Sequence, residues 1–558
     1  MAETPQKTFV SYSFSRIFKV ISLERNETTA IYFFAILNGI IDLSLPLGIQ
    51  SIISFVMGGA VSTSLVILIV LVVLGVFFNG LLHVNQLRII EKIQQKLFAR
   101  YAFEMADRIP KLNLHTIDGY YLPELVNRFF DVISLQKSIS KLLLDIPVAI
   151  IQIFFGLLLL SFYHPVFIFF GLMLIIILYA ILWASGSRGM ETSLQESDYK
   201  YKMAGWLEEM ARVVHTFKFS TNTNLNIHRT DELVSSYLDS RTAHFKVLLF
   251  QYWSLISFKV IITAIMLGVG SYLLVTQQLN VGQFIASEIV ILMVISSVEK
   301  IIVYLDKVYD VLTSLEKLSK ITEKPTESDG NIILSDDGSG GLSIEMKSVN
   351  FAYTNEANNI LENINLMIKH NQKICLMGPS GSGKSTLLRV MSGSFREFEG
   401  HILINGVPIT NLLSDSFRSQ TGILLSRQDI FQGTLLENIT MGNESIRVEQ
   451  IIDLANELGI NDFLDEFKNG FITQIDPTGR KLSRLIKQKI LLLRAFITQP
   501  RLLLLEEPFE GIEEETKLKI MDYLLDKKRK QTIIVTSNNQ YFADKCDRVI
   551  HLKEGKII

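Results

Sequence analysis

The stretch Gly378-Pro-Ser-Gly-Ser-Gly-Lys-Ser-Thr386 decides how the second half of this 558-residue chain folds. Its glycines let the backbone curl so that N–H groups converge on one point, a geometry that binds phosphate oxygens. The apolar run Lys373–Met377 precedes the loop, and Leu387–Met391 after it predicts a helix whose positive N-terminus points at the same place. The spacing therefore predicts a nucleoside triphosphate site, in which Lys384 contacts the terminal phosphates and Ser385 is a ligand of Mg²⁺.

A second apolar run, Arg501–Leu505, ends in Glu506-Glu507. Alone, this pattern would also fit a buried strand with a solvated end, but after a phosphate-binding loop it predicts a catalytic edge. We expect Glu506 to hold Mg²⁺ through water and Glu507 to act as the catalytic carboxylate that polarises the attacking water. The expected ligands of ATP in the loop are Gly378, Pro379, Ser380, Gly381, Ser382, Gly383, Lys384, Ser385 and Thr386.

The composition of the whole chain indicates a membrane protein. It is 48% hydrophobic and 20% charged, and its mean hydropathy is +0.31. The net charge of -2 gives no indication of a nucleic-acid partner. The two cysteines, Cys375 and Cys546, lie far apart in sequence, so no disulfide framework is implied.

Long apolar runs occupy the first 320 residues and are separated by charged stretches. Each is about 20 residues long, the length that a helix needs to cross about 30 Å of hydrocarbon. The expected spans are Ile31–Val56, Thr63–Val84, Leu142–Phe162, Val166–Ala184, Trp253–Val275 and Val281–Val303.

Charge between the spans predicts their orientation. Three short connections, Met57–Ser62, Tyr163–Pro165 and Thr276–Asn280, carry no Lys or Arg, whereas the other connections are long and basic. Basic loops stay on the cytoplasmic side, so we expect a multi-pass protein of the cell inner membrane with both termini in the cytoplasm.

The long connections are themselves helical in pattern. Leu87, Ile90, Ile93, Leu97 and Tyr101 recur at helical spacing. The pattern predicts that the spans continue tens of ångströms beyond the membrane, and runs rich in Asn and Thr predict turns near Asn113–Leu122 and Thr216–Ile227. The alternative is a set of soluble loops.

Composition changes abruptly after the last span. Residues 322–341 are polar and rich in glycine towards their end, which is typical of a linker. We therefore expect a transmembrane export domain with long helical extensions at 1–321, a linker at 322–341, and a nucleotide-binding domain of alternating strands and helices at 342–558.

The order of these features resembles the ABC exporter family over essentially the whole chain. The resemblance is carried by Val349-Asn-Phe-Ala-Tyr353, by Phe431–Ile439, and by Asp547-Arg-Val with Glu554-Gly-Lys near the end. It implies an α-helical membrane domain with six transmembrane helices of the type 1 exporter fold, followed by an α/β P-loop nucleotide-binding domain. It also implies that Tyr353 stacks on adenine.

The membrane half resembles the haemolysin-type exporters of type I secretion most, through Gln277–Phe284 and the helix Val298–Lys320. The resemblance implies a half-transporter that exports a peptide, protein or other substrate at the expense of Mg-ATP. Its expected partners are a second half-transporter, in a homodimer or a heterodimer, a periplasmic adaptor protein and membrane lipid. A lipid or drug exporter would have the same layout.

The family signature Leu-Ser-Gly-Gly-Gln corresponds to Leu482-Ser-Arg-Leu-Ile486 in this sequence. In the family, its glycines let backbone approach the terminal phosphate of the partner's ATP. Arg484 and Leu485 add bulk there, so the motif is degenerate.

Other positions depart from the family as well. The glutamine of the Q-loop corresponds to Ser426, with Gln428 nearby, and the switch histidine corresponds to Ser537. Glu506 stands where the family has Asp, and Glu510–Glu513 replaces Ser-Ala-Leu-Asp. Two hypotheses follow: a slow but working homodimeric exporter, or the degenerate ATP-binding half of a heterodimer or nucleotide-gated scaffold with little ATPase activity.

Two carboxylates fall inside expected spans, Asp42 in the first and Glu288 in the sixth. Such groups are costly in lipid and should face the bundle interior or a wet cavity. They either line a substrate pathway or pair with neighbouring helices, and the sequence favours neither alternative.

Overall fold

The computed structural model describes residues 16–59, 63–118, 121–220, 223–335, 340–354, 356, 358–426, 428–476 and 482–558. The chain forms two compact units. The first comprises Met1–Pro110 and Tyr121–Lys324, and the second comprises Lys111–Tyr120 and Pro325–Ile558. The division after Lys324 falls within the expected linker, part of which (336–339) lies outside the described residues, as do 119–120 and 221–222 of the two expected turns.

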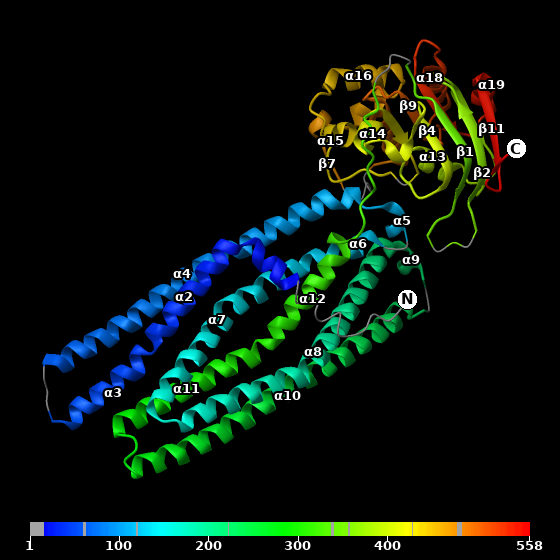
Figure 1. Cartoon of the computed structure of the whole chain (residues 1–558). Coiled ribbons are helices and arrows are strands. Elements are labelled where there is room, and N and C mark those ends of the chain that lie inside the picture. Colours follow the sequence, from blue (N-terminus) through cyan, green and yellow to red (C-terminus); the bar gives the residue numbers. More distant parts are fainter. Residues whose placement is uncertain are drawn as a thin grey trace. The chain divides into compact units, whose positions relative to one another are not determined.

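In its described residues, the first unit is built of helices joined by short turns (Figure 1). Its elements are α2 (Arg25–Asp42), α3 (Ser44–Met57), α4 (Thr63–Arg108), η1 (Ile109–Lys111), which ends one residue past the division, α6 (Leu122–Val126), η2 (Asn127–Phe130), α7 (Asp131–Tyr163), α8 (Val166–Arg212), α9 (Val214–Phe219), α10 (Leu225–Val275), α11 (Val281–Val303) and α12 (Leu305–Thr322).

Six helical segments in the described part of the chain are long and apolar enough to cross a membrane, which confirms the six expected spans. The prediction that spans extend into long helices is also confirmed. α4 has 46 residues, hence a length of about 70 Å at 1.5 Å per residue, more than twice the hydrocarbon thickness. The sequence did not predict the breaks at Leu43 and Tyr304, which divide the first and sixth segments into α2 and α3 and into α11 and α12.

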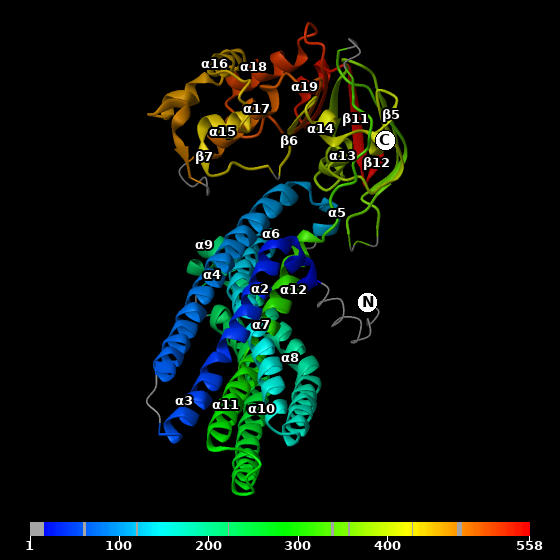
Figure 2. The same cartoon turned by 60° about the vertical axis from the view of Figure 1, so that its left-hand side comes forward.

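The helices of the first unit pack in neighbouring pairs. α8 and α10 run side by side in both views (Figures 1 and 2), and α7 lies against α11 and α12. Glycine permits the close approach of α7 to α11, because a Cβ on Gly156 would lie 2.6 Å from Val294 Cγ2. An apolar cluster from α7, α8, α10 and α11 forms the core of this region.

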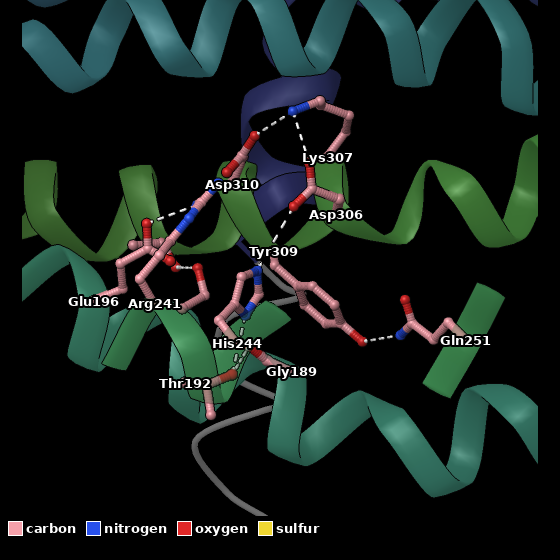
Figure 3. Close-up of polar contacts among 12 residues, drawn as sticks. Gly189, Thr192, Glu196, Arg241, His244, Gln251, Asp306, Lys307, Tyr309 and Asp310 are labelled. Atoms are coloured by element: carbon pink, nitrogen blue, oxygen red, sulfur yellow. Dashed lines mark hydrogen bonds and ion pairs between the residues drawn. The ribbon is translucent and has the colours of Figure 1, made fainter. Parts of the chain in front are cut away.

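A buried polar network joins α8, α10 and α12 (Figure 3). The ring of Tyr309 lies over Gly189, and its hydroxyl accepts a hydrogen bond of 3.0 Å from Gln251 Nε2. The imidazole of His244 lies between Thr192 Oγ1, 3.0 Å from Nδ1, and Asp306 Oδ1, 3.6 Å from Nε2. Three helices distant in sequence are thereby fastened together at one level.

The second unit is built on two main sheets in its described residues. A six-stranded sheet has the order β12-β11-β3-β10-β9-β6, and a four-stranded antiparallel sheet has the order β2-β1-β4-β5. The strands are β1 (Ile344–Phe351), β2 (Leu361–Ile368), β3 (Lys373–Met377), β4 (Glu399–Ile404), β5 (Val407–Pro408), β6 (Thr421–Leu424), β7 (Gly433–Thr434), β8 (Gln474–Ile475), β9 (Leu502–Glu506), β10 (Thr532–Thr536), β11 (Arg548–Lys553) and β12 (Lys556–Ile557).

Helices alternate with these strands, as the sequence predicts for an α/β domain. They are α13 (Lys384–Met391), η3 (Ile409–Asn411), α14 (Ser414–Arg418), α15 (Leu435–Thr440), α16 (Val448–Glu457), η4 (Asn461–Glu466), η5 (Gly470–Ile472), α17 (Arg484–Phe496), α18 (Glu514–Leu525) and α19 (Gln540–Lys545).

The parallel strands β3, β10 and β9 lie next to one another, with Leu376 opposite Thr536 and Thr536 opposite Glu506. Leu502–Leu505 of β9 are fully buried, as a central strand covered on both faces must be. Parallel strands end at the same edge of a sheet, which is where ligands of open α/β sheets bind. Residues that follow these three strands are thereby brought together.

The segment Lys111–Tyr120, which includes α5 (Leu114–Ile117), belongs to the second unit although it lies far from the rest of that unit in sequence. Glu327 N donates to Lys111 O at 2.8 Å, and Asn113 N donates to Pro325 O at 3.1 Å. Thr354 Oγ1 donates to the carbonyl oxygen of His115. The domain boundaries expected from the sequence did not assign this segment to the nucleotide-binding half.

Candidate functional site

The phosphate-binding loop has the predicted strand–loop–helix context. β3 ends at Met377, and α13 begins at Lys384. Gly381 and Gly383 have φ values of +79° and +100°, a left-handed region that favours glycine, so the glycines are needed for the turn itself. The loop therefore presents its backbone N–H groups at the N-terminus of α13, as an anion site requires.

Two side chains of the loop fit a phosphate ligand. Lys384 Nζ donates to the carbonyl oxygens of Gly378, at 2.7 Å, and Pro379, at 2.9 Å, so the ammonium lies directly over the loop. The Ser382 side chain is 3% exposed, and its Oγ has no hydrogen-bond partner among the described residues. A buried hydroxyl without a partner costs free energy, and a phosphate oxygen would satisfy it.

The two residues expected to hold Mg²⁺ are brought together. Ser385 Oγ donates to Glu506 Oε1 at 2.5 Å, and the backbone N–H of Ser426 donates to Glu506 Oε2 at 2.8 Å. A hydroxyl and a carboxylate, completed by waters and phosphate oxygens, are the ligands that Mg²⁺ prefers. The longer side chain of Glu506, compared with Asp, reaches Ser385 from the end of β9.

Glu507 lies next in the chain, with an unusual backbone conformation. Its φ is +43°, and its N–H lies 3.1 Å from both the carbonyl oxygen and Oγ1 of Thr536. Burial raises the pKa of the Glu507 carboxyl above its usual range; the charge of Lys384 opposes this shift, and Glu510 and Glu506 add to it. A carboxyl with a raised pKa is suited to accept a proton near neutral pH.

Thr536 and Gln488 also contribute to this arrangement, and sequence reasoning missed both. Thr536 is the last residue of β10 and is 1% exposed. Gln488 Nε2 lies 3.4 Å from the carbonyl oxygen of Glu507 and 3.3 Å from that of Pro508. The position of Thr536 at the end of a predicted strand is the only sequence signal that could have placed it at the site. No local pattern indicates a role for Gln488.

Tyr353 lies beside the loop, packed between two aromatic rings. Its ring meets Phe351 and Phe395 edge to face, with centroids 5.1 and 5.5 Å away. Its hydroxyl is 3.0 Å from Thr386 Oγ1 and 3.4 Å from Arg389 Nη1. The structure thus places Tyr353 at the nucleotide loop, while its stacking on adenine stays a prediction.

Arg389 was also missed, although it follows Ser385 by one helical turn and therefore lies on the same face of α13. Besides Tyr353, its guanidinium reaches Ser426 Oγ at 3.4 Å. Arg389 thereby connects the aromatic at the loop with the residue at the family's Q-loop position.

The residues that correspond to the family signature lie at the start of α17. Ser483 Oγ accepts a hydrogen bond of 3.2 Å from Ile486 N and so caps the helix. Arg484 points into solvent, 79% exposed, and forms an ion pair of 2.8 Å with Glu510. Ile486 is buried, and Leu485 packs against the same core. Neither side chain therefore faces outward, where the family signature would meet a partner's nucleotide.

Ser537, at the position of the switch histidine, lies at the end of β10 and is 3% exposed. Its Oγ accepts from Asn539 N at 3.1 Å, and its N–H donates to Leu376 O at 3.3 Å. Its carbonyl oxygen is 3.6 Å from the thiol of Cys375. Cys375 and Cys546 are both free thiols.

Of the two carboxylates in the spans, Asp42 is paired. It accepts hydrogen bonds from Asn79 and, at 2.5 Å, from Gln152 Nε2, whose Oε1 accepts from Ser297 at 2.8 Å. Asp42 is thus tied to three other helices. For Glu288, the described residues provide no hydrogen bond or ion pair.

Comparisons with known proteins agree with this geometry. Residues 361–510 match the family model described as ABC transporter, and residues 28–298 match the model described as ABC transporter transmembrane region. A solved structure, that of a bacterial Atm1-family ABC exporter with ATP bound, superposes with a TM-score of 0.81 over 96% of this chain and 95% of that one, at 19% identity. The predicted fold is confirmed.

Three curated relatives are similar over part of their length. The chain is 30% identical over 298 residues to the alpha-hemolysin translocation ATP-binding protein HlyB of Escherichia coli O157:H7 (53% of this chain, 42% of the relative). It is 27% identical over 297 residues to the leukotoxin export ATP-binding protein LtxB of Aggregatibacter actinomycetemcomitans (53% and 42%). It is 31% identical over 214 residues to ABC transporter B family member 13 of Arabidopsis thaliana (38% and 17%).

These matches span less than half the length of each relative. The two family models, by contrast, fall on the two halves of the present chain, one on the helices of the first unit and one on the loop and strands of the site. The chain therefore belongs to the ABC transporter family, as an exporter-type half-transporter that joins one six-helix membrane domain to one ATP-binding domain.

Proposed function

We propose that this chain is a subunit of an ATP-dependent exporter that binds Mg-ATP and moves a peptide, protein or other substrate outward across the inner membrane. The observation that carries the proposal is the convergence of Lys384, Ser385, Glu506 and Glu507 at one sheet edge, in a chain that also has six membrane-spanning helices. The names of relatives that translocate hemolysin or export leukotoxin support a secreted polypeptide as the substrate.

Each residue has a defined part in this function. Lys384 is the compact positive charge for the terminal phosphates, and the loop N–H groups bind the rest of the phosphate chain. Ser385 and Glu506 hold Mg²⁺, which neutralises charge on the phosphate oxygens. Glu507 orients the attacking water and accepts its proton, for which its raised pKa is suited.

A second subunit is needed to complete the site, because a half-transporter carries one membrane domain and one ATP-binding domain. We propose that hydrolysis in a homodimer is slow. The exposed side chain of Arg484 keeps the backbone of α17 from approaching a partner's phosphate closely, and Ser537 is buried and too short to replace histidine. A periplasmic adaptor and membrane lipid complete the proposed assembly, whose termini lie in the cytoplasm.

The second candidate is the degenerate half of a heterodimer, or a nucleotide-gated scaffold with little ATPase activity. The residues at the signature positions favour this candidate, because Arg484, Leu485 and Ile486 give the first turn of α17 no glycine or glutamine to offer a partner's nucleotide. In such a heterodimer, the partner's intact signature would complete the Lys384 site.

The test measures ATP binding and ATPase activity of the purified full chain in lipid nanodiscs, alone and mixed with an exporter subunit encoded by a neighbouring gene. We expect Lys384→Ala to abolish most Mg-ATP binding, while Lys369→Ala, at an exposed site in the same unit, leaves binding unchanged. Equal binding by wild type and Lys384→Ala would refute the proposal. Stimulation only by the neighbouring subunit would select the heterodimer, and slow activity of the chain alone would select the homodimer.

A further inference from the structure

A cavity of about 930 Å³ lies in the first unit between α4, α7 and α12. Its volume is at the upper end of the roughly 300–1,000 Å³ that ligand sites occupy. On α4 it is lined by Val84, Leu87, Arg88 and Glu91; Leu87 and Arg88 lie three and four residues after Val84, and Glu91 lies seven after it, so the four residues form one face of the helix. The cavity is thus built by continuous helix faces.

On α7 the lining residues Lys137, Lys141 and Leu144 are likewise spaced by three or four residues. α4 and α7 are tied together where Gln94, another lining residue, receives a hydrogen bond from Gln136 at its carbonyl oxygen. The walls are therefore fixed relative to one another by a polar contact between the two helices.

The polarity of the walls changes along the cavity. On α4 the apolar span Thr63–Val84 ends at the lining residue Val84, and on α7 the apolar span Leu142–Phe162 begins just before the lining residue Leu144. Val84 and Leu144 therefore mark the end nearest the membrane, and the charged residues mark the other end. A ligand that fits this gradient has an apolar part directed towards the membrane and a charged head group away from it.

The charge of that head group follows from which side chains are already paired. Lys307, from α12, is neutralised by Asp306 at 2.9 Å and Asp310 at 2.8 Å (Figure 3). Asp310 also accepts from Ser138 Oγ at 3.3 Å. The two carboxylates more than neutralise the single ammonium, so this set offers no positive charge to a ligand.

Three cations remain. Arg88, Lys137 and Lys141 are exposed, and the described residues provide none of them with an ion pair or hydrogen bond. The single acid among the remaining lining residues is Glu91, which accepts from Gln95 at 2.9 Å. Lys137 and Lys141 are one turn apart on α7, a like-charge spacing that destabilises a helix unless an anion lies between them.

We propose that this cavity binds an anionic amphiphile, whose phosphate or carboxylate head group is held by Arg88, Lys137 and Lys141 and whose single acyl chain lies against Val84 and Leu144. Its assignment as exported cargo, or as the acyl part of a cargo, rests on the proposed function above. The binding itself does not, since it requires neither ATP nor a partner subunit.

The experiment uses the purified full chain in neutral phosphatidylcholine nanodiscs and, as probe, an oleoyl lysophosphatidic acid with a photoreactive group in its chain. We expect crosslinks in the peptides containing Val84–Gln94 and Ser134–Leu144. Unlabelled lysophosphatidic acid and oleate should compete, whereas the neutral monooleoyl glycerol and inorganic phosphate should not. Competition by oleate would identify a free fatty acid as an alternative source of the head group, and competition by phosphate alone would overturn the proposal.

Matched variants test the cations. Lys137→Gln with Lys141→Gln should weaken probe binding at least tenfold, because hydrogen bonds to charged groups are the strong ones, and Lys137→Arg with Lys141→Arg should restore most of it. Lys246→Gln, at an exposed lysine of α10 outside the cavity, should leave binding unchanged. Binding should also weaken as ionic strength rises.

Unchanged crosslinking in the glutamine variant, or equal competition by the neutral lipid, would refute the proposal. A loss of dimerisation without a change in probe binding would show instead that a second copy of the chain covers the cavity. Binding of Mg-ATP, measured in the same samples, separates this proposal from the proposed function. If probe binding is absent while Mg-ATP binding is intact, only the proposal about the cavity fails.

Discussion

Gly189 on α8 offers a sharp test of how the helices of the first unit are held together. A Cβ at this position would lie 2.3 Å from Cζ, 2.5 Å from Oη and 2.6 Å from Cε2 of Tyr309. Ordinary contacts between carbon atoms are about 3.5–4.0 Å. In Gly189→Ala, either α8 and α12 must separate by about 1 Å or the ring of Tyr309 must leave its position (Figure 3).

The expected loss of stability in Gly189→Ala follows from these two responses. Overpacking of a well-packed site costs about 1–3 kcal/mol. Expelling the ring, which is 3% exposed, would expose about 150 Å² at about 25 cal/mol per Å², hence about 4 kcal/mol, and would break the hydrogen bond with Gln251. The cheaper response limits the cost, so we expect a loss of about 1–3 kcal/mol.

The assay is thermal unfolding of the purified full chain in detergent, followed by intrinsic fluorescence. Gly186→Ala is the matched control, because a Cβ there meets no atom within 4 Å. It should be neutral or stabilising, as glycine is unfavourable inside a helix. Tyr309→Phe should cost about 1 kcal/mol, for the lost hydroxyl.

The double variant Gly189→Ala with Tyr309→Ala completes a cycle. Removing the ring removes the clash, so the double variant should be no less stable than Tyr309→Ala alone, and the two effects should not add. Additive effects, or a Gly189→Ala protein as stable as the wild type, would show that the close packing of Tyr309 on Gly189 does not hold the helices together.

Three further outcomes are expected. The substitutions Arg484→Gly, Leu485→Gly, Ile486→Gln and Ser537→His place the family's signature and switch residues in this chain. Together they should raise ATP turnover by an order of magnitude or more, about 1.4 kcal/mol of activation free energy per factor of ten. Rapid ATPase activity of the wild type without a partner would contradict the reasoning. Because Ile486 is buried, a set without Ile486→Gln serves as a stability control. The pKa of Glu507 is raised above 4.5, and the carboxyl must be ionised to accept a proton. The acid limb of the pH profile of kcat/KM should therefore lie above pH 4.5 and should disappear in Glu507→Gln. An unchanged acid limb in that variant would assign the titration to another group. In a background without Cys375 and Cys546, cysteines placed at Gly59 and Gln278 should react with an impermeant thiol reagent from outside the cell, whereas those at Lys111 and Lys218 should not, and the reverse pattern would overturn the orientation.

Local sequence patterns were sufficient for the elements of this protein but not for their contacts. Apolar length predicted the spans, because burial in hydrocarbon depends on composition over about 20 residues. Likewise, the loop Gly378–Thr386 was predictable because its glycines and lysine act within a single turn. The break at Leu43 is marked by Pro46, which has no N–H to bond the carbonyl oxygen of Asp42, but this signal was overlooked, whereas no proline or glycine lies near Tyr304.

The contacts of the site depend on neighbours distant in sequence. Arg389 meets Ser426 across 37 residues, and Thr536 meets Glu507 across 29. Which side chains lie opposite one another is determined by the strand order β3-β10-β9, which no single segment encodes. Sequence reasoning therefore found the residues of the loop and the carboxylates but missed Arg389, Thr536 and Gln488.

The assignment of Lys111–Tyr120 to the second unit has a consequence for how this molecule can be divided. The peptide chain passes between the units at three places, after residues 110, 120 and 324, so they share three covalent tethers rather than one. A fragment that begins at Pro325 would leave Thr354, the neighbour of Tyr353, without the oxygen of His115 that accepts its hydroxyl proton. A faithful excision or exchange of the ATP-binding half, in the laboratory or through recombination, must carry this ten-residue insert with it.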